Sequence, residues 1–184
     1  MDYLAYGSNM LSSRLLKRVS SARDPRVARV PGHVVRYRKL SVDGSAKCDL
    51  VLAGEPGTAY GVVFDIDSGQ RATLDGFEDV GGGYHAAPIT VLVGGRRLDA
   101  FTYLADASHV VRGVSPYDWY RDLVVAGALE HGLPGAYIRE QLAVQAVADE
   151  DAERARRERL HLEQPPLRRH GSGAGRRTQR NGDR

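Results

Sequence analysis

Segments rich in β-forming residues follow one another along most of this chain, and their order restricts the folds available to it. Strand composition is found at residues 3–6, 27–42, 59–66, 84–93 and 97–104. Helices are expected only at residues 12–17, 67–77, 115–132 and 134–148. This order lacks the regular strand–helix alternation of a doubly wound sheet. We therefore predict an α+β fold, a small mixed β-barrel or curled sheet with helices packed outside.

Glycine, proline and polar residues predict where these elements begin and end. Pro31-Gly32 breaks the segment at 27–42, which we expect to form one or two strands. Gly94-Gly95 lies between two β-rich segments and predicts a hairpin. Ser115-Pro116 is a typical helix start, and Gly132 a typical stop. Residues 43–57 contain several Gly and Pro residues, so we expect turns there.

The charge distribution divides the chain into a domain at 1–148 and a tail at 149–184. The tail contains ten Arg and seven acidic residues, whereas residues 1–148 contain sixteen charges of each sign. The net charge of +3 therefore belongs to the tail, which we expect to be disordered because it has few apolar residues. A nucleic-acid arm is an alternative reading of this tail. The tail has no interleaved aromatic residues, however, and its charge is mixed, which argues against nucleic-acid binding.

The composition also limits the cellular setting. At 184 residues with 42% hydrophobic content, the chain can form one domain with a real core. No apolar run has the length of a membrane helix, so no membrane association is expected. Cys48 is the one cysteine, which excludes an intrachain disulfide, and the N-terminus lacks a signal peptide. We expect a cytoplasmic protein and leave open whether it forms a homodimer.

Two short segments carry the strongest indications of chemistry. The first is Tyr6-Gly7-Ser8-Asn9-Met10, a polar turn directly after an apolar strand, whose amides can bind an anion or a carbonyl oxygen. The second contains Glu78 beside a glycine run, where a lone carboxylate can transfer protons. Taken alone, each has a plainer explanation as an ordinary turn or a solvated charge. Together they indicate an acid/base enzyme that needs no metal and no cofactor.

Four segments, in order, resemble the γ-glutamylcyclotransferase-like (AIG2-like) family. Tyr6-Gly7-Ser8-Asn9 resembles the family's N-terminal turn, and residues 59–64 (AYGVVF) resemble its central strand. Leu74-Asp75 with Glu78 resembles the segment that holds the family's acid/base glutamate, and residues 122–137 resemble its C-terminal stretch. Three positions depart from the pattern. Asp79 replaces a frequent glycine, Met10 replaces a frequent leucine, and Tyr84 matches a substrate-lining tyrosine only after a one-residue deletion.

The resemblance implies that a γ-glutamyl amide cyclises to 5-oxoproline and releases a free amine, as in a transferase or lyase without cofactor. Glu78 would be the catalytic acid/base, because the amine must lose a proton and the leaving nitrogen must gain one. Substrate-binding residues would be Tyr6, Gly7, Ser8, Asn9, Met10 and Tyr84, with turn amides at the oxyanion and Ser8 or Asn9 at the α-carboxylate. Two alternatives stay open, namely deglutamylation of a γ-glutamyl-protected natural-product intermediate and a non-catalytic small-molecule-binding module.

Overall fold

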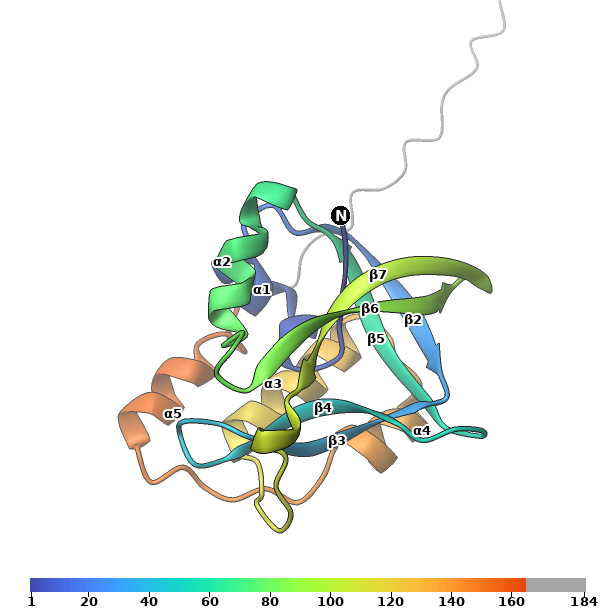
Figure 1. The fold of residues 1–184 in the computed structure, drawn as a ribbon. Coiled ribbons are helices and arrows are strands. Elements are labelled where there is room, and N and C mark those ends of the chain that lie inside the picture. The colour runs from blue at the N-terminus through green and yellow to red at the C-terminus, as the bar shows by residue number, and fades with distance from the viewer. Residues whose placement is uncertain (165–184) are drawn as a thin grey trace, which may run out of the picture.

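Five strands close into a barrel in the computed structural model, which describes residues 1–164 (Figure 1). In their order around the barrel the strands are β1 (Asp2–Ala5), β5 (Thr58–Asp65), β2 (Arg23–Pro31), β6 (Tyr84–Val93) and β7 (Arg96–Ala105). Neighbours pair antiparallel except β1 and β7, which close the barrel in parallel by pairing Tyr3 with Phe101. The predicted mixed barrel is therefore confirmed, as is the β6–β7 hairpin.

A second hairpin, β3 (His33–Leu40) with β4 (Ala46–Leu52), packs beside the barrel. The expected break at Pro31-Gly32 separates β2 from β3. The turns expected in residues 43–57 lie at the two ends of that segment, and β4, which was not expected, occupies about half of it. The charged residue Asp49 of β4 is buried, with 2% of its surface exposed. Arg38 of β3 donates a 2.7 Å hydrogen bond to the Asp49 carboxylate. Backbone pairing with β3 thus stabilises a strand that includes charged residues.

Helices cover one side and one end of the barrel (Figure 1). They are α1 (Ser12–Arg18), α2 (Arg71–Phe77), α3 (Asp118–Glu130), α4 (Gly135–Tyr137) and α5 (Ala152–Arg159), with 3-10 turns η1 (Ser8–Met10), η2 (Ser68–Gln70) and η3 (Ala107–His109) and a π-turn η4 (Ile138–Leu142). The single long helix expected at residues 134–148 is therefore wrong, since α4 and η4 end at Leu142. No helix within residues 1–164 is long and apolar enough to span a membrane.

The longest helix, α3, packs along the turn that follows β1. Tyr117 is its N-cap, so the start lies two residues after the predicted Ser115-Pro116. Its buried residues are Trp119, Tyr120, Leu123, Val124, Gly127 and Ala128, a spacing that places them on one face. Leu129 lies outside this face and is 64% exposed. The buried face of α3 therefore includes Tyr120 and Gly127 beside its large apolar residues.

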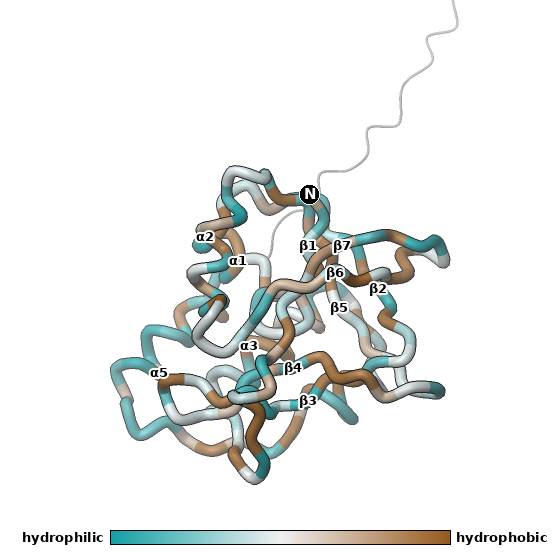
Figure 2. Tube along the Cα trace, viewed as in Figure 1, coloured by the Kyte–Doolittle hydropathy of each residue, from teal (hydrophilic) through white to brown (hydrophobic). Residues whose placement is uncertain are grey.

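The segment predicted to begin the disordered tail instead contains helix α5. Figure 2 shows that α5 is mostly hydrophilic, yet Ala155 is buried and Arg14 donates a 2.6 Å hydrogen bond to Glu158. Asp151 caps the helix by accepting from the amide of Arg154. The boundary expected at residue 148 is therefore too early. Residues 165–184 lie outside the described residues, and disorder there stays a prediction.

Candidate active site

The polar turn after β1 is a single turn of 3-10 helix that presents backbone amides. Two hydrogen bonds close it, from the amide of Met10 to the Gly7 carbonyl and from that of Leu11 to the Ser8 carbonyl. The amides of Gly7, Ser8 and Asn9 are left outside this pairing, as is usual at the start of a helix. A Cβ at Gly7 would stand 3.2 Å from the Tyr120 hydroxyl, so glycine lets the turn lie close to α3.

Glu78 stands at the C-terminal end of α2, and a network of side chains holds its carboxylate beside this turn. Its Oε1 atom accepts hydrogen bonds from Asn9 Nδ2 at 2.7 Å and from Arg18 Nη1 at 3.2 Å. Asn9 Nδ2 also donates to the Tyr3 hydroxyl, and Arg18 Nη1 also donates to Asn9 Oδ1. No hydrogen bond within residues 1–164 uses Glu78 Oε2, so this oxygen can accept a proton from a ligand.

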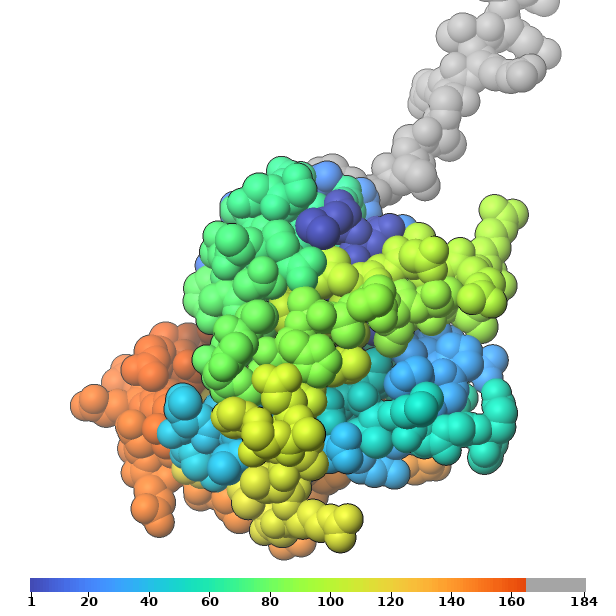
Figure 3. Space-filling model, in the orientation of Figure 1, coloured from blue at the N-terminus to red at the C-terminus, as the bar shows by residue number. Residues whose placement is uncertain are grey.

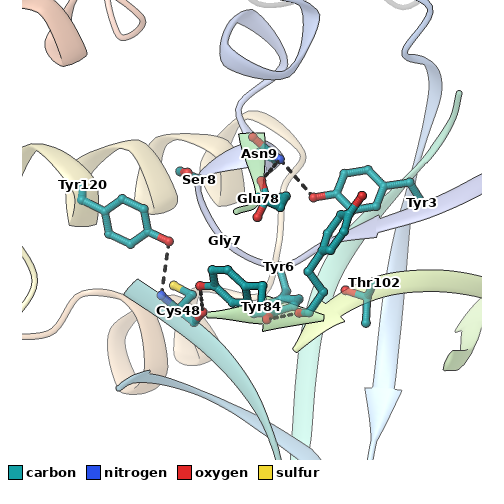
Figure 4. A pocket seen from close by; sticks show the side chains of 11 residues that line it. Tyr3, Tyr6, Gly7, Ser8, Asn9, Cys48, Glu78, Tyr84, Thr102 and Tyr120 are labelled. Carbon is teal, nitrogen blue, oxygen red and sulfur yellow. Dashed lines mark hydrogen bonds between the residues drawn. The ribbon is translucent and has the colours of Figure 1, made fainter. Parts of the chain in front are cut away.

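These residues line one small cavity of about 310 Å³, partly open to solvent (Figure 4). Its lining consists of Tyr3, Tyr6, Gly7, Ser8, Asn9, Cys48, Glu78, Tyr84, Thr102, Tyr103 and Tyr120. Glu78 is the one carboxylate in this set. Burial raises the pKa of Tyr3, Tyr6, Tyr84 and Tyr120 well above the ordinary phenol value, so these phenols are neutral at physiological pH. The cavity thus combines one ionisable carboxyl group with neutral hydroxyl and amide groups.

The tyrosines of the lining are fixed by hydrogen bonds to the backbone. Tyr84 donates to the Cys48 carbonyl at 2.5 Å, and Tyr6 donates to the Tyr103 carbonyl at 2.5 Å. The Tyr120 hydroxyl accepts from the amide of Cys48 at 3.2 Å. These contacts join α3 and β6 to β4, and Tyr6, which follows β1, to β7, so the shape of the cavity follows from the packing of distant segments.

Six of the seven residues predicted for the site line this cavity: Tyr6, Gly7, Ser8, Asn9, Glu78 and Tyr84. Met10 does not, because its side chain is fully buried in the core and its amide is used within the turn. The Asn9 side chain is engaged with Glu78, Arg18 and Tyr3, so it positions the carboxylate and is not free for an α-carboxylate. Asp79 has a φ of 55°, which explains why glycine is frequent at this position.

Sequence reasoning missed Tyr3, Arg18, Tyr103 and Tyr120. Tyr3 and Tyr103 lie on the barrel strands β1 and β7, and only barrel closure brings their rings to 5.8 Å. Arg18 is one basic residue among several near the end of α1, and its contact with Glu78 depends on how α1 packs against α2. Tyr120 follows Trp119 in the sequence, and only the observed rotation of α3 directs it to the cavity.

Cys48 lies in the cavity lining, and its chemistry yields a direct prediction. The side chain is in β4 and 2% exposed, and burial raises the pKa of its thiol to about 12. At pH 8 the thiolate fraction should fall roughly 1000-fold below that of a free cysteine, and only the thiolate is alkylated. Iodoacetamide should therefore leave the native protein unlabelled by mass spectrometry and label the urea-unfolded chain once. Equal labelling rates in both states would contradict the buried position.

A larger hollow of about 1060 Å³, also open to solvent, adjoins the small cavity. Ser8, Glu78, Tyr84 and Tyr120 line both. Its far side comes from α5, through Arg154 and Glu158, and from the loop between β3 and β4, which lies beside α5 in Figure 3. A ligand whose reacting group meets Glu78 thus has room to extend away from the turn.

Comparison with known proteins identifies relatives over most of the chain. The model of the AIG2-like family matches residues 58–141. A γ-glutamylcyclotransferase from Bos taurus is 28% identical over 139 residues, which cover 73% of each chain. Among solved structures, a γ-glutamyl cyclotransferase has a TM-score of 0.77 at 22% identity and covers 89% of this chain and 99% of its own. YkqA from Bacillus subtilis has a TM-score of 0.68 at 26% identity, covering 76% of this chain and 52% of its own.

These comparisons agree with the geometry of the site and with one another. The structural match at 22% identity supports the mixed five-stranded barrel with its helices. The family match includes Glu78 and Tyr84, and the sequence relative spans about three quarters of the chain. The chain therefore has the fold of a γ-glutamyl cyclotransferase, and its residues 58–141 match the AIG2-like family.

Proposed function

We propose that this protein converts a γ-glutamyl amide into 5-oxoproline and a free amine. The observation that carries the proposal is that Glu78, the one carboxylate in the small cavity, shares that cavity with Gly7, Ser8 and Asn9, whose amides are not used in the hydrogen bonds that close the turn. Such an arrangement suits a reaction that moves a proton and builds negative charge on an oxygen. The small cavity is open on one side, and the adjoining hollow leaves room for the part of the substrate that extends away from Glu78.

The nucleophile is the substrate's own α-amine, so the protein need not supply one. The amine nitrogen attacks the γ-carbonyl carbon, closing a five-membered ring, and Oε2 of Glu78 takes the proton that the nitrogen loses. The amides of Gly7, Ser8 and Asn9 stabilise the tetrahedral oxyanion. Glu78 then gives its proton to the leaving nitrogen as the carbon–nitrogen bond of the original amide breaks. Glu78 ends the cycle as a carboxylate.

Ring closure gains much of its rate from conformational restriction. A well-oriented intramolecular reaction saves roughly 7–11 kcal/mol of entropic and solvation cost, provided the substrate is held bent. The small volume and the fixed tyrosines of the cavity supply this restriction. The Tyr3 hydroxyl accepts from Asn9, and no hydrogen bond within residues 1–164 uses its proton, which leaves it able to donate to the substrate.

A panel of γ-glutamyl compounds tests the proposal. The purified protein is incubated with γ-glutamyl amino acids, γ-glutamyl polyamines and γ-glutamyl aminoglycosides, and released 5-oxoproline is quantified by mass spectrometry. Turnover of any panel member above the uncatalysed rate supports the proposal. Binding of these compounds without 5-oxoproline release would instead favour a non-catalytic binding module on the same fold.

Asn9 should act as a positioning residue for Glu78. In Asn9→Ala the carboxylate loses its shortest hydrogen bond, so kcat should fall roughly 10- to 100-fold, the usual effect of losing a hydrogen bond to a charged group. In Asn9→Asp a second carboxylate disfavours ionisation of Glu78, so the acidic limb of the pH–rate profile should shift to higher pH. Steady-state kinetics from pH 4 to 9 measure both effects. An unshifted profile in Asn9→Asp would exclude this role.

A further inference from the structure

The backbone that directly follows the polar turn is held by the last residues of α3. Glu130 is the final residue of this helix, and it shares one face with Gly127 because the two are three residues apart. His131 is the C-cap, and Gly132 follows with a φ of 69°, the glycine stop that ends many helices. This defined helix end holds the side chains of Glu130 and His131 against the start of α1.

Glu130 binds the amide of Ser12, the first residue of α1. Its Oε2 atom accepts a 3.1 Å hydrogen bond from that amide, which belongs to the first turn and therefore has no partner inside its own helix. The Glu130 side chain is 10% exposed and lines neither the small cavity nor the larger hollow. Any influence of Glu130 on the site must therefore pass through the backbone at Ser12.

His131 binds the carbonyl of Met10, the last residue of the turn. Its Nε2 atom lies 3.0 Å from the Met10 carbonyl oxygen and 3.3 Å from the Ser12 hydroxyl oxygen. A carbonyl oxygen can only accept a hydrogen bond, so Nε2 carries the proton. The imidazole also packs edge-on against Phe64 of β5, with 5.7 Å between the ring centres. The ring therefore contacts the barrel while its Nε2 atom binds the turn.

Both contacts fall where the turn ends, and this location gives them a role in the site. Only two backbone hydrogen bonds close the turn, so its peptide groups depend on outside contacts for a fixed orientation. β1 holds the start of the turn by pairing with β5, and Glu130 and His131 hold its end. The unused amides of Gly7, Ser8 and Asn9 lie between these two fixed points.

We propose that Glu130 and His131 are positioning residues that orient the amides of the turn toward the oxyanion. This inference rests on the proposed cyclisation and adds to it two side chains outside the cavity. The oxyanion forms only in the transition state, so a loss of orientation should lower kcat and leave KM nearly unchanged. In Glu130→Ala the Ser12 amide loses its acceptor, and kcat should fall roughly 10- to 100-fold. Glu130→Gln should stay within about threefold of wild type, because its side-chain carbonyl can accept the same hydrogen bond.

A thioamide substrate separates this orientation from a general loss of folded protein. Sulfur accepts hydrogen bonds more weakly than oxygen, so γ-glutamyl-L-alanine gains more from the turn amides than its γ-thioamide does. Release of L-alanine gives kcat/KM for both compounds. The amide-to-thioamide ratio should be roughly 10-fold smaller in Glu130→Ala than in wild type, and unchanged in Glu130→Gln. A smaller folded fraction lowers both values equally and leaves the ratio as it is.

The same ratio tests His131, and an exposed glutamate supplies the control. His131→Leu removes the donor to Met10 and should also reduce the ratio, whereas His131→Gln supplies an N–H group for that carbonyl and should restore most of it. Glu140→Ala removes an exposed glutamate outside both cavities and should keep the wild-type ratio. If another γ-glutamyl compound is turned over in place of γ-glutamyl-L-alanine, that compound and its thioamide form the pair.

The outcomes separate this inference from the proposed function. An unchanged ratio in Glu130→Ala or in His131→Leu overturns the role of that residue and leaves the cyclisation standing. Absence of amine release from every γ-glutamyl compound overturns the cyclisation instead. Hydrogen exchange followed by NMR then decides on the two contacts. Exchange of the Met10 and Leu11 amides should be roughly 10-fold faster in both variants, with β5 unchanged, and wild-type rates at these amides would overturn the inference.

Discussion

Glu78→Gln should lose nearly all turnover while keeping its fold and its substrate affinity. The amide of glutamine has nearly the same shape as the carboxylate, and the side chain is 17% exposed, so the barrel and α2 should be undisturbed. A glutamine side chain cannot take up or release a proton at physiological pH, and loss of general acid–base catalysis costs roughly 100- to 10,000-fold in rate. We expect kcat to fall within that range and KM to change little.

The measurement is 5-oxoproline release under saturating γ-glutamyl substrate, with circular dichroism and thermal melting as tests of folding. Glu55→Gln is the matched control, because Glu55 is an exposed glutamate outside both cavities. It should turn over substrate at the wild-type rate. Retention of more than about a tenth of the wild-type kcat in Glu78→Gln would rule out Glu78 as the group that moves the proton.

Gly127→Ala should have the second largest effect, because it acts on stability and turnover together. A Cβ at position 127 of α3 would come within 2.4 Å of the Leu11 amide nitrogen and 2.7 Å of the Met10 carbonyl carbon. Both are backbone atoms at the end of the polar turn, so the helix and the turn must move apart. Overpacking of this kind costs about 1–3 kcal/mol of unfolding free energy. A displacement near 1 Å at the oxyanion donors should lower kcat roughly 100-fold.

Gly76→Ala supplies the comparison, because it also replaces a glycine within a helix. A Cβ at Gly76 meets no atom within 4 Å, so alanine there should raise the free energy of unfolding by about 0.5–1 kcal/mol. Urea unfolding measures the free energy of unfolding of both variants, and steady-state kinetics measure their kcat. The difference between the two variants gives the effect of forcing α3 away from the turn, apart from the effect of adding a methyl group to a helix. An unchanged kcat in a destabilised Gly127→Ala protein would show that the position of the turn does not limit catalysis.

The sequence predicts the barrel strands and the two main segments of the candidate site well, because each has a local pattern. Alternation and β-branched residues mark β5, β6 and β7, and the polar turn follows directly from an apolar strand. β4 has no such pattern, since Lys47, Cys48 and Asp49 lack β-strand character and are stabilised by pairing with β3. The expected helix at residues 134–148 has suitable residues, but the backbone leaves helical geometry at Ala143.

The site shows the same limit. Glu78, Gly7, Ser8 and Asn9 are predictable because they lie in two short motifs, whereas Arg18 and Tyr3 contact these motifs only after the barrel and helices have packed.

Helix α5 has a consequence for where this domain ends. Arg14 has a side chain only 8% exposed, and Glu158 supplies its counter-charge across 144 positions of sequence. Farther along, Ser13 donates its hydroxyl proton to the carbonyl of His161. A chain stopped at residue 148 would leave Arg14 without this counter-charge and Ser13 without this hydrogen bond. Shortened versions of this protein should therefore extend past residue 161 to keep both contacts with α1.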